Sequence, residues 1–138
     1  MNDRFPTDPL DEGWRPMDDD TFIGHLGSVY SRPAGGFYEL GILTGRHHQN
    51  KSGIVHGGVM MTVFDRAMGG NVRDMRAGER FATASMTVDF LREVRIGEFI
   101  RVTSFLTKAG RKAVFMRGEA HVGDRLVGAA SAVFMTVG

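Results

Sequence analysis

Regular alternation of apolar and polar residues runs through the second half of the chain and predicts β-strands. The alternation has a period of two over residues 83–90 and continues over 100–106, as expected for strands with one buried face. Glycine-containing pairs at 109–110 and 123–124 are typical of hairpin turns. The segment 126–137 is small and apolar on both faces. We therefore predict four consecutive strands in this half.

A different pattern covers residues 57 to about 74, where apolar side chains occupy most of a helical circumference. A helix that is apolar nearly all round is typically buried. Gly69 and Gly70 interrupt it and would allow another backbone to approach closely. The apolar positions of this predicted helix are Val59, Met60, Met61, Val63, Phe64, Ala67, Met68, Val72 and Met75.

Two further strands are predicted before this helix. Residues 37–43 have a β-type composition, Val29 and Tyr30 belong to a shorter strand, and residues 33–36 form the turn between them. The order of two strands, one helix and four strands favours an α+β fold, with an antiparallel sheet wrapped around one long central helix.

Length and composition restrict the remaining possibilities. The 138 residues indicate one domain at 21–138, preceded by a loose acidic lead-in at 1–20 that Trp14 could anchor. The balance of 17 basic against 16 acidic residues predicts no broad basic face for nucleic acid. Neither an apolar signal core nor a membrane-length apolar run occurs, so we expect a cytoplasmic protein without membrane contact. The absence of cysteine excludes disulfides and a cysteine nucleophile.

The start of the predicted helix carries the main candidate chemistry. Gly57 and Gly58 stand at the helix entrance, where free backbone N–H groups and the positive dipole end can polarise a carbonyl oxygen. Asp65 follows inside an apolar run, where a carboxylate is costly to bury. This pairing indicates chemistry on an acyl group.

The residues around this entrance form a longer motif. His48, Asn50, Gly53, His56, Gly57 and Gly58 precede Asp65, and Thr83, the segment Val88–Leu91 and Gly97 follow. Over residues 22–137 the chain resembles the hotdog-fold acyl-CoA thioesterases, and most closely the phenylacetate-degradation-type (PaaI-like) branch. The chain departs from that family at residues 92–94, where a proline is usual.

The resemblance implies a role for each matching residue. The Gly57 N–H polarises the thioester carbonyl, Asp65 attacks it or activates water, and Asn50 orients the reacting groups. Thr83 helps to position water or the carboxylate, and His56 holds the loop. His48, Gly58, Val59 and Phe90 are expected on the substrate-binding side, with His48 shaping the loop. The substrate is an acyl-CoA, with coenzyme A as part of the substrate and no cofactor or metal.

Helix geometry then predicts a dimer. Eight helical residues span about 12 Å, whereas the polarising N–H and the attacking carboxylate must both lie about 3 Å from one thioester carbon. Two antiparallel copies of the helix can satisfy both requirements, with Gly57 of one subunit facing Asp65 of the other. We therefore predict a two-fold homodimer with sites at the interface, and the resemblance implies a homotetramer built as a dimer of dimers.

Structural roles remain open for each of these residues. Asp65 could be satisfied by local hydrogen bonds, Gly57 could belong to a plain turn, Asn50 could cap a loop, and Thr83 is ordinary in a strand. Two other functions also remain, a non-catalytic acyl-CoA-binding hotdog protein and a hotdog hydratase or dehydratase. The second usually has a catalytic histidine paired to an acid on or near the helix, and the interior of the predicted helix contains no histidine.

Overall fold

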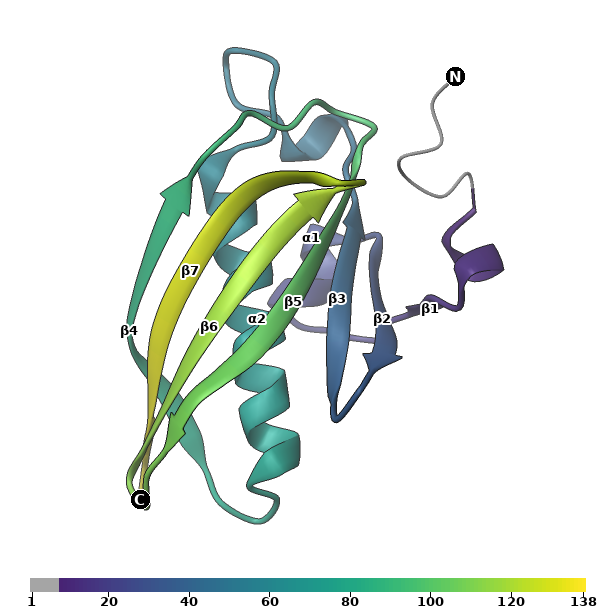
Figure 1. The fold of residues 1–138 in the computed structure, drawn as a ribbon. Helices are drawn as coiled ribbons and strands as arrows, with labels where there is room; N and C mark the ends of the chain where they lie inside the picture. The colour runs from purple at the N-terminus through teal and green to yellow at the C-terminus, as the bar shows by residue number, and fades with distance from the viewer. Residues whose placement is uncertain (1–7) are drawn as a thin grey trace.

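The computed structural model describes residues 8–138, which form one curved sheet, one long helix and three short helical segments (Figure 1). The helical segments are η1 (Pro9–Glu12), α1 (Phe22–Leu26), η2 (Arg46–His48) and α2 (Gly57–Met75). The strands are β1 (Arg15–Pro16), β2 (Val29–Ala34), β3 (Phe37–Leu43), β4 (Phe81–Phe90), β5 (Phe99–Ala109), β6 (Ala113–Val122) and β7 (Arg125–Thr136).

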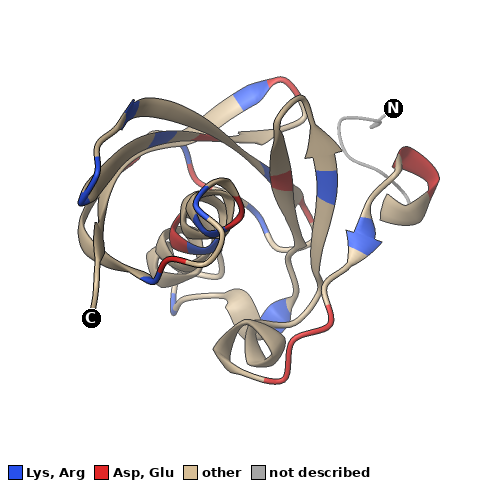
Figure 2. Cartoon of the chain, turned by 90° about the horizontal axis from the view of Figure 1, so that it is seen from below, with Lys and Arg blue, Asp and Glu red and all other residues tan. Residues whose placement is uncertain are grey.

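All neighbouring strands pair antiparallel, in the order β1-β2-β3-β5-β6-β7-β4. Seen along its axis, α2 lies inside the curl of this sheet (Figure 2). The predicted α+β hotdog architecture, an antiparallel sheet around one long helix, is therefore confirmed. The short η and α1 elements carried no clear pattern and were not predicted.

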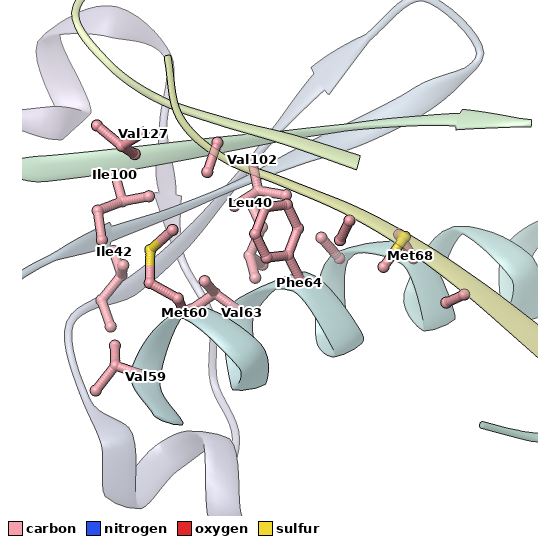
Figure 3. Packing of buried hydrophobic residues seen from close by; sticks show 14 of the residues in the cluster. Leu40, Ile42, Val59, Met60, Val63, Phe64, Met68, Ile100, Val102 and Val127 are labelled. Atoms are coloured by element: carbon pink, nitrogen blue, oxygen red, sulfur yellow. The ribbon is translucent and has the colours of Figure 1, made fainter. Parts of the chain in front are cut away.

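One face of α2 builds the hydrophobic core against the concave side of the sheet. Phe64 and Met68 are fully buried there. In Figure 3, Phe64 lies beside Leu40 of β3 and Val102 of β5, Ile42 and Ile100 lie near Met60, and Met68 lies further along the helix. Full burial of each such side chain contributes about 1.5–3 kcal/mol. This packing fixes the position of α2 along the concave face of the sheet, and with it the positions of Gly57 and Asp65.

The expectation that α2 is buried on all sides was wrong for the single chain. Met61 is 40% exposed and Asp65 is partly buried, because the sheet covers only one side of the helix. No helix of residues 8–138 is long and apolar enough to cross a membrane. An apolar side chain on the uncovered face of α2 is consistent with a surface that meets another chain.

The turn between the first two strands is shorter than predicted. β2 runs through Pro33 to Ala34, which pairs with Phe37, so only Gly35 and Gly36 form the turn. Gly35 has φ +65°, as the tight two-residue hairpin requires. β1 pairs with β2 only at Tyr30 and Ser31, so no strand lies opposite Pro33 on that side. Pro33 is tolerated there because no hydrogen bond from its backbone nitrogen is needed.

The strict alternation predicted for β4 is also interrupted. A bulge between Thr83 and Ser85 leaves Ala84 outside the ladder, and Phe90 is 53% exposed rather than buried. Met86 and Val88 do pack partly against the core. Among the strands of residues 8–138, β4 is an edge strand that pairs only with β7. Its other edge and much of its side-chain surface are therefore available to a partner chain.

The acidic segment near the N-terminus is attached through Trp14, as expected. Its indole is 1% exposed and lies 5.1 Å from the ring of Phe99 in an edge-on arrangement. The Arg32 guanidinium stacks 4.3 Å over the indole, a favourable cation–π contact. Gly41 provides the space, since a Cβ there would meet Phe99 at 2.3 Å.

Candidate active site

Asp65 and Thr83 come together between α2 and β4. The Thr83 hydroxyl donates a hydrogen bond of 2.6 Å to Asp65 Oδ1. A hydroxyl–carboxylate bond of this length is a strong, charge-assisted one. It fixes the orientation of the carboxyl group and leaves Oδ2 without a partner among residues 8–138. The sequence predicted that Thr83 positions the Asp65 carboxylate or water. The bulge next to Thr83 changes the register of β4 where the strand passes the helix.

The first turn of α2 leaves the Gly57 N–H without a partner. His56 is the N-cap, and its Nδ1 accepts from the Gly58 N–H at 2.8 Å, while the Val59 N–H bonds the His56 carbonyl at 2.9 Å. Among residues 8–138 no acceptor engages the Gly57 N–H. His56 therefore holds the helix entrance, in the loop-holding role favoured from the sequence, and Gly57 can donate outward.

Asn50 organises the loop that precedes the helix. Its side-chain Oδ1 accepts from the N–H groups of Ser52 at 2.8 Å and Ile54 at 3.3 Å, and its own N–H bonds the Ile54 carbonyl at 2.8 Å. The loop-cap role is therefore present. The Nδ2 group makes no hydrogen bond within residues 8–138, so the same side chain can also donate to a substrate.

His48 is buried beneath this loop, with 2% of its surface exposed. The Gly45 N–H donates to Nδ1 at 2.9 Å, and Nε2 donates to the Leu26 carbonyl at 2.6 Å. Burial lowers the pKa of the imidazole, and the neighbouring His47 lowers this pKa further. His48 is thus a neutral, fully bonded residue that shapes the loop, and it lines none of the hollows described below.

This arrangement predicts a pH-dependent stability. Because the folded pKa of His48 lies below that of the unfolded chain, the unfolded state binds the proton more readily, and stability is full above about pH 6.5 and lost as pH falls. We expect the free energy of unfolding to fall by up to about 1.4 kcal/mol per pH unit below that point. Urea titrations between pH 7.5 and 5.5 measure it. His48→Asn should flatten this dependence, and the exposed control His25→Gln should keep it.

Within one chain, the predicted site residues lie in two separate places. Asn50, Gly57 and Phe90 line one hollow of about 340 Å³ at the entrance of α2. Asp65 and Thr83 line two others further along the helix, of about 470 and 420 Å³. Nothing in residues 8–138 brings the two groups to one hollow. This is the separation that motivated a dimeric site.

The remaining predicted substrate-side residues differ in their surroundings. Phe90 packs over Gly57, where a Cβ would meet its ring at 3.3 Å. The Gly58 N–H already donates to the N-cap residue His56. Val59 belongs to the core, with 8% of its surface exposed. Leu91 and Arg92 also line the entrance hollow. The sequence pointed to Leu91 only as part of the Val88–Leu91 segment, and Arg92 was not predicted as a site residue. Their place directly after the end of β4 was the available signal.

No group of three His, Asp or Glu side chains that could hold a metal occurs within residues 8–138. His47 and His48 stack 3.8 Å apart, but their Nε2 atoms both meet the Leu26 carbonyl. The two rings are therefore used by the fold, and a metal role for them has no support in the geometry.

Comparison with known proteins now places the chain in a family. The sequence profile of the Thioesterase superfamily matches residues 52–129, more than half of the chain and including α2 and its entrance. A Pseudomonas aeruginosa protein named "Putative esterase PA0474" is 32% identical over 88 residues, 63% of this chain. That alignment spans 66% of the relative's own length. The chain belongs to the Thioesterase superfamily.

Solved structures agree on the fold. The PaaI protein of the Escherichia coli phenylacetic acid degradation operon superposes with a TM-score of 0.78 at 19% identity, covering 87% of this chain and 86% of that one. The BH2602 protein of Bacillus halodurans, solved with CoA, gives a TM-score of 0.74 at 21% identity, covering 86% and 78%. The expected resemblance to hotdog thioesterases is thereby confirmed at the level of superfamily and fold.

Proposed function

We propose that this protein is an acyl-CoA thioesterase that hydrolyses an acyl-CoA thioester to a free carboxylic acid and CoA. The observation that carries the proposal is the pairing of an oriented carboxylate with an unengaged helix-start N–H. Asp65 is fixed by Thr83 at 2.6 Å, and the Gly57 N–H has no partner within residues 8–138. Membership of the Thioesterase superfamily supports the same reaction class.

The chemistry assigns a role to each group. The Gly57 N–H donates to the thioester oxygen as negative charge develops there. Asp65 either takes a proton from the attacking water or attacks the carbonyl carbon to give a mixed anhydride that water then opens. In both cases the C–S bond breaks, and the CoA thiolate leaves and takes up a proton. Asn50 Nδ2 orients the reacting groups.

The site is proposed to form between two subunits. The exposed apolar side chains of Phe90 and Met61 lie next to the two half-sites, and the outer edge of β4 offers backbone groups for pairing. Pairing two copies about a two-fold axis would cover these groups and run the two α2 helices antiparallel. Gly57 of one subunit would then face Asp65 of the other, and two such dimers would form the homotetramer implied by the family.

The entrance hollow suggests where the CoA moiety lies. Arg92 and Glu93 line it and also line a neighbouring hollow of about 720 Å³ that contains Arg95. Arg125, Glu98 and Asp124 line that hollow too, and Arg125 is paired with Glu98 at 3.0 Å. Guanidinium groups bind phosphates strongly. The phosphates of CoA would therefore lie on this side of Gly57, and the acyl group on the side of Asp65. The CoA complex of the Bacillus halodurans protein supports CoA as a ligand.

Thr83 offers a test of the proposed positioning role. Thr83→Val removes the hydroxyl but keeps the shape, so Asp65 loses its orienting bond. We expect kcat to fall by roughly tenfold, the effect of losing one hydrogen bond to a charged group, with KM changed much less. Thr83→Ser restores the donor and should recover most of the rate. Equal rates for the valine and serine variants would remove Thr83 from the mechanism.

The two other functions make different demands. A hotdog hydratase or dehydratase would need a histidine on the helix, and His56 at its start has Nδ1 committed to the Gly58 N–H. A non-catalytic binding protein would hold acyl-CoA without consuming it. Free-thiol release from a panel of acyl-CoA thioesters separates these cases, because only a thioesterase liberates CoA. Tight binding without thiol release would favour the binding protein.

A further inference from the structure

The hollow beside Asp65 and Thr83 is unusually cationic. This hollow has a volume of about 420 Å³. It is lined by Arg66 and Arg73 of α2 and by Arg80 in the loop after the helix. Glu79 also lines it, but Arg76 holds both of its carboxylate oxygens, at 2.7 and 3.0 Å. Figure 2 shows basic and acidic positions at this end of α2. The acyl side of the site therefore carries positive charge that thioester hydrolysis does not require.

Arg66 is the member of this group closest to the reaction centre. It follows Asp65 in sequence, and lines both hollows that contain Asp65 and Thr83. It is partly buried, yet within residues 8–138 it makes no hydrogen bond and no ion pair. The carboxylates of Asp19, Asp74 and Asp65 act on its charge without forming an ion pair with it. A partly buried guanidinium without a partner is costly unless a ligand supplies the missing anion.

The glycine at position 70 is explained by the same side chain. A Cβ on Gly70 would come within 2.1 Å of Arg66 Nη1, so the guanidinium lies against the bare helix backbone. A glycine inside a helix is destabilising by about 1 kcal/mol relative to alanine. With glycine at position 70 the Arg66 guanidinium can lie against the helix, and a Cβ there would move this flexible side-chain end aside. Gly69 serves the core instead, since its Cβ would press on the Phe134 ring at 3.1 Å.

Burial also lowers the pKa of the Arg66 guanidinium, and the like charge of Arg73 lowers it further. Both effects reflect a cation that is short of compensating charge, and an added carboxylate would reverse them. Lysine or a neutral residue would not offer the same planar, two-pronged match to a carboxylate.

We propose that Arg66 binds a carboxylate at the far end of the acyl group, so that the preferred substrates are CoA thioesters of short dicarboxylic acids. This inference rests on the proposed thioesterase function. Asp65 and Thr83 line this hollow and also the more apolar one beside Phe22 and Met61. Arg66 lines both hollows, so an acyl chain attached to the reacting carbon would pass it in either one. The phosphates of CoA are separated from that carbon by the pantetheine arm, and in the proposed function they lie beside Arg92 and Arg95, beyond Gly57.

The test compares glutaryl-CoA with pentanoyl-CoA, which have acyl chains of equal length and differ in the terminal carboxylate. We expect wild-type kcat/KM to be about tenfold or more higher for glutaryl-CoA, the effect of a charge-assisted hydrogen bond. Arg66→Gln should abolish this preference by lowering the glutaryl-CoA rate, and Arg66→Lys should restore part of it. Gly70→Ala should also weaken the preference by displacing Arg66, while raising the thermal unfolding midpoint.

The contrary outcomes are distinct. Equal wild-type rates for the two substrates would overturn the inference and leave the thioesterase proposal intact. An equal loss for both substrates in Arg66→Gln that disappears with the corresponding pantetheine thioesters would assign Arg66 to the CoA phosphates, which also overturns it. Arg92→Gln serves as the matched control and should affect both CoA substrates alike. Failure of the wild type to release thiol from any acyl-CoA would instead contradict the thioesterase function itself.

Discussion

Replacing Asp65 by asparagine is expected to lower acyl-CoA turnover by at least about 100-fold, in the range of losses for a general base. Asparagine keeps the shape of the side chain, and its carbonyl oxygen can still accept the 2.6 Å bond from Thr83. What is lost is the negative charge that takes the proton or attacks the carbonyl. Steady-state thiol release at saturating substrate measures the effect.

The control for this variant is its stability. Asp65 makes no ion pair within residues 8–138 and is only partly buried, so we expect the unfolding midpoint to change little. A folded Asp65→Asn protein with nearly wild-type turnover would exclude Asp65 as the reacting group. It would leave the carboxylate with the structural role that the sequence had left open.

Gly57→Val is expected to reduce turnover on a similar scale, about 100-fold or more, as for removal of one oxyanion-hole donor. The ring of Phe90 lies 3.3 Å from the position of a Cβ at Gly57, so a branched side chain must push into the hollow where the thioester oxygen would bind. The N–H would remain in the chain but would be screened from the substrate. The same thiol-release measurement applies.

Gly36→Val provides a matched replacement of glycine by valine at an open position. A Cβ at Gly36 meets no atom within 4 Å, and the position lies in the β2–β3 turn, away from the site. This control should retain nearly full activity. Unchanged hydrolysis by folded Gly57→Val would show that the Gly57 N–H does not polarise the carbonyl.

The sequence predicted the fold well because its two periodicities are strong. The alternation of β5 directly reflects burial on one side of the strand. The apolar residues of α2 identified the central helix, although they overstated how much of it is buried in one chain. Predictions failed where the neighbouring chain segment decides the outcome. The extension of β2 through Pro33 depends on how short its partner β1 is, and the exposure of Phe90 depends on β4 being an edge strand. Neither the length of β1 nor the edge position of β4 can be predicted from the residues of β2 or β4 alone.

The candidate site was predictable in part. The motif from His48 to Asp65 identified the helix entrance, and the pairing of Thr83 with Asp65 is now visible as a hydrogen bond. The neutral, fully bonded state of His48 could not be predicted, because Leu26 and Gly45 reach it only in the folded chain. Arg66 was missed for a similar reason. Its significance depends on its place beside Gly70 and on its forming no ion pair with the carboxylates around it.

The central claim is that two subunits share each reaction centre, and mixing two inactive variants tests it most directly. In a mixed dimer of Asp65→Asn and Gly57→Val chains, one site combines the intact Gly57 of the first chain with the intact Asp65 of the second. The other site carries both changes. Random pairing should therefore restore about one quarter of wild-type activity, since half of the dimers are mixed and each holds one intact site.

The measurement is thiol release from an equal mixture of the two variants, co-expressed so that the subunits exchange, with each variant alone as reference. Recovery toward one quarter of wild-type turnover is the predicted result. If the mixture stays at the average of the two separate variants while mixed dimers are demonstrably present, each subunit carries a complete site of its own, and the shared reaction centre is wrong.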